Sequence, residues 1–224
     1  MQIEARFRRR SIVNQSLDHL QSIDLEKLSE IDELWQVEVG AEPYIDQGIG
    51  ESASCDITDC LVKGVEGALS YASRLEGSVI DKASSDDILI LTVDIDLIDF
   101  KEFSCHTFPK IIGAFNPYRA SIVTDLDLDL DDFEDIVDKV QKTGKDVDGR
   151  DSVYRFCVAN FFDSEMCNRA FGLTPQKVVS VLQKSLVYVD LIFGGVLMIL
   201  SISPLVGQDL VAADEMIKRE LSNL

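Results

Sequence analysis

Alternating apolar and polar residues predict the strands of this chain. A period of two, typical of a half-buried strand, recurs in three stretches: residues 2–9, 87–97 and 118–130. Two further apolar runs within residues 186–202 flank Gly194-Gly195, and they predict a buried antiparallel hairpin with a primed turn. A membrane helix over the same residues is disfavoured, because Asp190 and the glycine pair interrupt the apolar run.

Apolar residues three and four positions apart predict the helices. This spacing recurs over residues 14–31, 56–74, 131–142, 174–184 and 208–221. Residues 101–114 predict a helix or turn, and residues 44–54, which contain Pro, Gly and Ser, predict a loop. The irregular alternation of helices and strands predicts an α+β fold, a single twisted, largely antiparallel sheet with helices packed on it. We expect residues 1–224 to form a single domain, because no linker composition interrupts them.

The most unusual stretch is acidic. Asp125, Asp127 and Asp129 alternate with three leucines, which predicts a strand with its leucines in the core and its aspartates on the opposite face. Five more acids follow where the pattern becomes helical: Asp131, Asp132, Glu134, Asp135 and Asp138. A fold gains nothing from like charges on one face, because they repel each other. We therefore expect an external cation, either a basic protein or a metal ion.

The charge of the whole chain favours a basic protein partner. Asp plus Glu number 40 against 21 Lys plus Arg, a formal net charge of −19. Nucleic acid and anionic membranes are poor partners for such a chain, whereas an acidic surface speeds the association of a basic protein. The aspartates would lie side by side if the strand of residues 87–97 neighboured that of 118–130. The predicted partner-binding residues are Asp94, Asp96, Asp99, Asp125, Asp127, Asp129, Asp131, Asp132, Glu134 and Asp135.

Motifs for catalysis or cofactor binding are missing from the sequence. The chain has His19 and His106 but no HExxH, GxSxG, Walker or GxGxxG pattern, and its five cysteines lack CxxC spacing. We therefore expect no enzyme activity and no cofactor, and a reducing cytoplasm fits the unpaired cysteines and the lack of a signal peptide. Two alternatives stay open: a solvated acidic surface, and a metal-binding or metal-dependent hydrolase module that uses the aspartates.

Three segments resemble the Immunity protein 52 family of bacterial polymorphic toxin systems. They are RRRSIVNQSLDHLQSIDLEKLSEIDELWQ at residues 8–36, NPYRASIVT at 116–124 and GGVLMILSISPLVGQDLVAADEMIKREL at 194–221. The resemblance implies a non-enzymatic cytoplasmic protein that neutralises a cognate toxin delivered by type VI secretion. The toxins of this family resemble nucleases, and a nuclease must present a basic cleft to DNA. An acidic face could occupy that cleft; the oligomeric state is left open.

Overall fold

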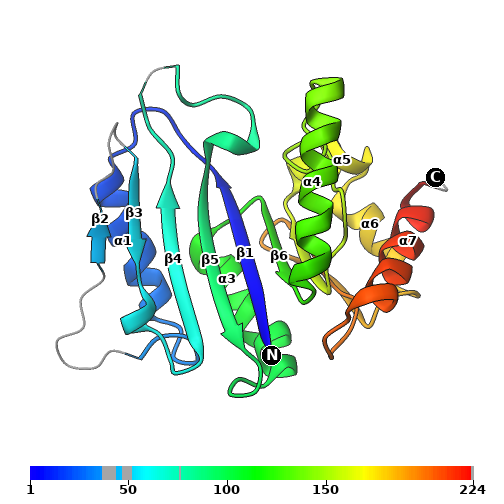
Figure 1. The fold of residues 1–224 in the computed structure, drawn as a ribbon, viewed down its shortest axis with the longest axis horizontal. Coiled ribbons are helices and arrows are strands. Elements are labelled where there is room, and N and C mark those ends of the chain that lie inside the picture. Colours follow the sequence, from blue (N-terminus) through cyan, green and yellow to red (C-terminus); the bar gives the residue numbers. More distant parts are fainter. Residues whose placement is uncertain (37–43, 47–51, 76, 223–224) are drawn as a thin grey trace. The chain divides into compact units, whose positions relative to one another are not determined.

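The computed structural model describes residues 1–36, 44–46, 52–75 and 77–222. The chain forms two compact units, Met1–Pro117 and Tyr118–Leu224 (Figure 1). Within the described residues no helix is both long enough and apolar enough to cross a bilayer. The prediction of a single domain over 1–224 stays a prediction.

The first unit is built on an antiparallel sheet. Its strands are β1 (Gln2–Arg10), β2 (Tyr44–Asp46), β3 (Ala53–Asp56), β4 (Val65–Tyr71) and β5 (Asp86–Asp94). Their order is β2-β3-β4-β5-β1, so the N-terminal strand pairs with β5, from Gln2 opposite Asp94 to Arg10 opposite Asp86. Burial alternates strictly along β4, which means that one face of the sheet is packed and the other is open.

Helices cover the packed face of this sheet. Helix α1 (Leu17–Ser29) has Ser16 as its cap and begins three residues after the predicted start at residue 14, because Asn14 adopts a left-handed conformation with φ 61°. A continuous helical run follows β5 as α2 (Phe100–Glu102), a π-helical turn η3 (Phe103–Thr107) and α3 (Phe108–Phe115). Both α1 and α3 lie behind the strands in Figure 1. The ring of Phe7 on β1 lies 5.2 Å from that of Phe108 on α3.

The second unit carries its own antiparallel strands and helices. Its elements are β6 (Arg119–Val123), α4 (Leu126–Thr143), β7 (Ala159–Phe162), α5 (Ser164–Phe171), α6 (Pro175–Leu182), β8 (Tyr188–Ile192), β9 (Gly195–Ile199) and α7 (Gly207–Ser222). The strand order is β6-β7-β9-β8, and neighbouring strands pair antiparallel. The predicted α+β class, with antiparallel pairing and packed helices, is confirmed.

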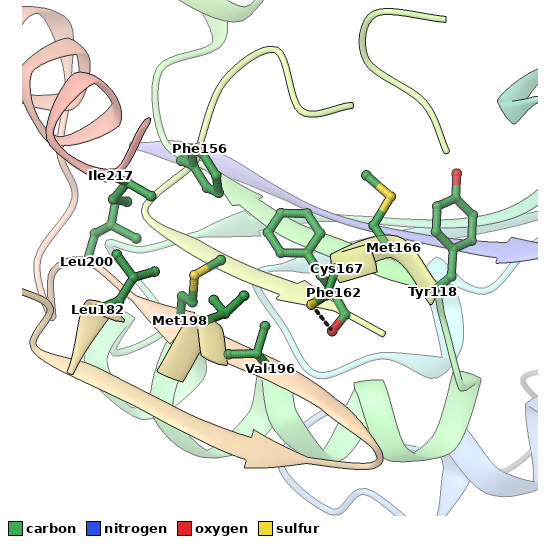
Figure 2. Packing of buried hydrophobic residues seen from close by; sticks show 11 residues of the cluster. Tyr118, Phe156, Phe162, Met166, Cys167, Leu182, Val196, Met198, Leu200 and Ile217 are labelled. Carbon is green, nitrogen blue, oxygen red and sulfur yellow. Dashed lines mark hydrogen bonds between the residues drawn. The ribbon is translucent and has the colours of Figure 1, made fainter. Parts of the chain in front are cut away.

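A compact core joins β7 and β9 to α5, α6 and α7. Figure 2 shows Val196 and Met198 of β9 among side chains from all three helices, including Cys167, Leu182 and Ile217. The thiol of Cys167 donates to the carbonyl oxygen of Phe162 at 3.8 Å, a contact drawn as a dashed line in Figure 2. These apolar side chains are almost fully removed from water, which is the main driving force for folding this unit.

The predicted hairpin is present, with two corrections, the first being that its turn lies one residue before the predicted Gly194-Gly195. Its turn residues are Phe193 and Gly194, at φ 47° and 77°, which is the primed geometry that suits the twist of antiparallel strands. Strand β9 is buried throughout, but β8 is largely exposed. The prediction that both strands are buried is therefore wrong for β8, because β8 is the last strand in the sheet order.

Three predictions for the first unit are wrong. The strand predicted over residues 87–97 ends at Asp94, so Asp96 lies in the turn that follows. Residues 56–74 contain the strand β4 and a short helical turn, η1 (Thr58–Cys60), in place of the predicted helix. Gly64 and Gly67 weaken a helix, and a side chain at Gly67 would collide with Leu61 and Leu91. Residues 44–54 include β2 and the start of β3 where a loop was predicted; residues 47–51 lie outside the described residues.

Candidate functional site

The acidic stretch folds as a helix, not as a strand. Strand β6 ends at Val123, and α4 begins at Leu126. Asp125 caps the helix: its Oδ1 accepts from the amide of Leu128 at 3.0 Å, and its Oδ2 accepts from the amide of Gly207 at 2.7 Å. These backbone donors lower the pKa of Asp125, because they stabilise its charged form. The predicted strand over 118–130 is therefore wrong beyond Val123, and the helix starts before the predicted residue 131.

The physical reason for this correction lies in the aspartates themselves. Asp is depleted in strands, whereas Asp at a helix cap and in the first turn interacts favourably with the positive end of the helix dipole. Asp127 and Asp129 lie in that first turn of α4. The left-handed Gly144, at φ 68°, ends the helix at its other end.

The ten predicted partner-binding residues divide between the two units. Asp94, Asp96 and Asp99 belong to the first unit, where Asp94 ends β5 and Asp99 caps α2 by accepting from the amide of Glu102 at 2.7 Å. The terminal amine of Met1 lies 2.6 Å from a carboxylate oxygen of Asp96. The other seven lie on α4 or at its cap in the second unit: Asp125, Asp127, Asp129, Asp131, Asp132, Glu134 and Asp135.

The carboxylates of α4 have different environments. Asp132 is buried, and its two oxygens accept from Nε and a terminal nitrogen of Arg155, the latter at 2.6 Å. This pairing raises the pKa of Arg155, because the adjacent carboxylate stabilises the guanidinium charge. Asp127, Asp131 and Glu134, by contrast, are exposed to solvent. The predicted acidic surface therefore includes the carboxylates of Asp127, Asp131 and Glu134 but not that of the buried Asp132.

Arg155 joins α4 to α7. Its other terminal nitrogen lies 3.5 Å from Asp214 of α7, and Asp214 also accepts from Lys218 at 2.8 Å and from the backbone amide of Phe156 at 2.8 Å. Asp132 and Asp214 thus compensate the charges of Arg155 and Lys218 within the unit. Ion pairs to these two cations therefore hold the carboxylates of Asp132 and Asp214 inside the unit.

Tyr154 forms a second attachment of the same face of α4. Its hydroxyl donates to Asp135, and Lys139 lies 2.6 Å from Asp135 and 4.6 Å from the centre of the Tyr154 ring. Hydrogen bonds from Lys139 and Tyr154 lower the pKa of Asp135. The sequence gives one signal for this contact, the spacing of four between Asp135 and Lys139, which favours an ion pair along a helix.

A buried charge cluster in the first unit was not predicted. Arg9 of β1 contacts Asp24 of α1 through both terminal nitrogens at 2.7 Å, and Asp87 of β5 at 3.2 Å. Arg74 donates to both oxygens of Asp87 at 2.7 Å, and the hydroxyl of Tyr71 donates to Asp24 at 3.0 Å. Two cations face two carboxylates, so the cluster is neutral.

The charge cluster is structural in character. Asp24, Asp87 and Arg74 are buried, and they connect β1, α1, β5 and the residues after β4. Burial and the neighbouring Asp24 raise the pKa of Tyr71, so its hydroxyl stays protonated and donates. Sequence reasoning missed the cluster because its members are far apart along the chain. The only sequence signal is that Asp24 and Asp87 each interrupt a predicted apolar face, one on the helix over residues 14–31 and one on the strand over 87–97.

Few of the described side chains could act as a nucleophile or bind a metal ion. Burial raises the pKa of the Cys167 thiol to about 12, which keeps it protonated at neutral pH. His106 is exposed and lies 3.9 Å from Glu102 one turn earlier. In the part of the chain that the structure describes, no group of three or more His, Cys, Asp or Glu side chains is arranged to hold a metal ion.

Comparison with known proteins gives a fold relationship. No protein-family model matches the chain, and no curated protein matches its sequence. Among solved structures, the chain is similar to the Pseudomonas aeruginosa T6SS protein PA0821, with a TM-score of 0.58 and 9% sequence identity. The match covers 98% of this chain and 72% of the other. At that identity the similarity concerns the fold alone.

Proposed function

We propose that the chain is an immunity protein that binds and neutralises a cognate secreted toxin. The observation that carries this proposal is the exposed carboxylates of α4, Asp127, Asp131 and Glu134, which make no ion pair with any described residue. The excess of acids over the whole chain adds to the local charge. Similarity in fold to a T6SS protein supports a role connected with type VI secretion, and the resemblance to the Immunity protein 52 family supports the immunity role.

The proposed mechanism is electrostatic association followed by occlusion. The toxin is a basic nuclease domain, whose cationic cleft attracts α4 and speeds encounter. Bound carboxylates then occupy the positions that substrate phosphates would take. Neutralisation of this kind takes place in the cytoplasm of the toxin's target cell and requires binding, without catalytic turnover. The protonated Cys167 thiol and the exposed His106 fit a protein without a nucleophile–base pair.

A charge-matched pair of variants tests the proposal. The first replaces Asp127, Asp131 and Glu134 with Asn, Asn and Gln; the control replaces three exposed acids of the first unit, Glu26, Glu30 and Glu66, with Gln. Both variants lose the same net charge. Co-expression with the toxin encoded by the neighbouring gene, followed by pull-down and cell survival, should show lost protection for the first variant only.

The salt dependence of binding adds a second measurement. Added salt should slow association with the toxin more than it speeds dissociation, because the exposed carboxylates act mainly on encounter. Equal protection by both variants, with binding insensitive to salt, would show that the acidic face of α4 is only a solvated surface. The alternative, a metal-dependent hydrolase, predicts metal-dependent turnover on nucleic acid, esters or peptides that Asp127→Asn abolishes.

A further inference from the structure

Helix α4 faces its unit with a largely charged side, on which Leu128 and Ile136 are half-buried beside Asp132 and Asp135. Asp132 and Asp135 make the contacts to Arg155 and Tyr154, and Asp132 is the only buried residue described in this helix. An amphipathic helix of a globular protein normally turns its apolar stripe to the core and its charges to water. The orientation of α4 is the reverse of that rule.

The apolar side of α4 is a stripe that is half-buried at Leu126 and exposed from Leu130 to Val140. It consists of Leu126, Leu130, Phe133, Val137 and Val140, at alternating spacings of four and three. At roughly 100° per residue, this spacing keeps the five side chains within one band about 80° wide, on the opposite side of the helix from Asp135. Leu130 is 62% exposed and Phe133 is 60% exposed, and Val137 and Val140 are exposed as well. We call these five residues the α4 stripe.

Heptad spacing indicates what kind of surface the α4 stripe fits. Side chains that alternate by three and four positions pack into the matching spaces of a second helix. A large exposed apolar patch bordered by polar residues is typical of a protein interaction site. The geometry therefore favours an amphipathic helix as the occupant.

The charges beside the α4 stripe favour a basic helix as its occupant. Asp127, Asp131 and Glu134 border the α4 stripe along one side, and no described cation pairs with them. The lysines of α4 are already engaged, Lys139 with Asp135 at 2.6 Å and Lys142 with Asp138 at 2.5 Å. A second copy of this chain would therefore bring no available lysine from α4 to the exposed carboxylates.

We propose that the α4 stripe is a docking surface for a basic amphipathic helix of the protein partner. The inference rests on the proposed function and names the chemistry of the partner at the same site. The apolar face of that helix packs on Leu130 and Phe133, and its flanking Lys or Arg side chains pair with Asp127, Asp131 and Glu134. Apolar burial holds the complex together, while the charges steer the approach and fix the orientation.

A designed peptide provides the probe for this surface. We would use a fluorescein-labelled helix of three heptads with Leu at the seam and Lys at the flanking positions, and a matched peptide with Glu in place of Lys. Fluorescence anisotropy with the full chain should show binding of the Lys peptide and none of the Glu peptide. Equal affinity for the two peptides, or no binding of either, would overturn the proposal.

Paired variants separate packing from charge. Leu130→Gln with Phe133→Gln removes the centre of the α4 stripe but leaves every carboxylate in place. Its control is Ile202→Gln with Val206→Gln, which replaces two exposed apolar residues of the same unit. The stripe variant should bind the Lys peptide at least about tenfold more weakly, and the control should bind as the unaltered chain does. Unchanged binding by the stripe variant would mean that bare charge attracts the peptide and would refute docking on the stripe.

Sedimentation velocity tests whether a second copy of this chain covers the α4 stripe instead. The unaltered chain should sediment as a monomer at the concentrations used for anisotropy. A dimer that disappears in the stripe variant would show that a second copy covers the surface and would overturn the proposal.

The toxin assay distinguishes the two proposals. If the stripe variant loses the peptide yet protects cells fully, docking on the stripe is refuted as the mode of toxin binding and the immunity function stands. If the Lys peptide binds at the stripe but no co-encoded protein is neutralised, the docking surface stands and the immunity function fails.

Discussion

Removal of Asp87 should strongly destabilise the first unit. This carboxylate is 1% exposed and accepts from Arg74 at 2.7 Å, from Arg9 at 3.2 Å and from the backbone amide of Ala72 at 3.2 Å. The variant Asp87→Ala leaves two guanidinium groups against Asp24 alone, so the buried cluster acquires a net positive charge. Breaking a buried ion pair in this way costs about 3–5 kcal/mol.

That loss is large compared with the stability of an ordinary domain, which is about 5–15 kcal/mol. For a chain of this length it corresponds to a fall in Tm on the order of 6–20 °C. Urea titrations followed by far-UV circular dichroism measure the loss directly, with Glu66→Gln on the open face of β4 as the control. The control should lie within about 0.5 kcal/mol of the unaltered chain.

A double-mutant cycle with Arg74→Ala tests the mechanism. Removing Arg74 together with Asp87 restores neutrality, so the double variant should be more stable than the sum of the single losses predicts. The reasoning fails if Asp87→Ala loses less than about 1 kcal/mol, or if the two changes are additive. Either result would mean that the cluster is solvated enough for its charges to act independently.

Three further outcomes follow from the second unit. Asp125→Ala should lower the free energy of unfolding by about 1 kcal/mol, because it removes the cap of α4 and the acceptor of the Gly207 amide. The fold lowers the pKa of Asp125, so its contribution to stability is fully present above the ordinary carboxyl pKa. That contribution is lost as the pH falls through the lowered pKa of the folded state. Urea titrations of the variant and the unaltered chain should therefore give converging free energies of unfolding in acid. Phe133→Gln should leave Tm almost unchanged in a thermal scan, because the side chain is already in water. Iodoacetamide at pH 8 should modify Cys105 before Cys167, whose pKa is raised to about 12, as peptide mass spectrometry would show.

Strands with buried and open faces were predictable from the sequence. Apolar alternation located β1 and β5, and the glycine pair located the hairpin of β8 and β9. The helix predicted over residues 174–184 is present as α6, which Thr174 caps and Pro175 begins, because capping depends on chemistry local to the sequence. Helix α5 was not predicted.

The acidic stretch was misassigned because two periods coexist in it. Leu126, Leu128 and Leu130 alternate with aspartates over six residues and imitate a strand. The longer pattern through Phe133 and Val137 is helical, and a window of six residues is too short to distinguish them. The orientation of α4 was beyond sequence reasoning, because it depends on where Arg155 and Tyr154 lie in the fold.

Because α4 exposes its apolar side, selection for a stable fold and selection for partner binding act on different residues. A substitution in the core of the second unit changes packing and therefore stability, so few are tolerated. A substitution at Leu130 or Phe133 changes side chains that are 62% and 60% exposed, so the residues that would select a partner can change with little effect on the stability of the fold. A lineage carrying this helix can follow an altered partner, or exchange one partner for another, through successive changes on a single surface. The polar attachment through Arg155 keeps the helix in place while its outer side diversifies.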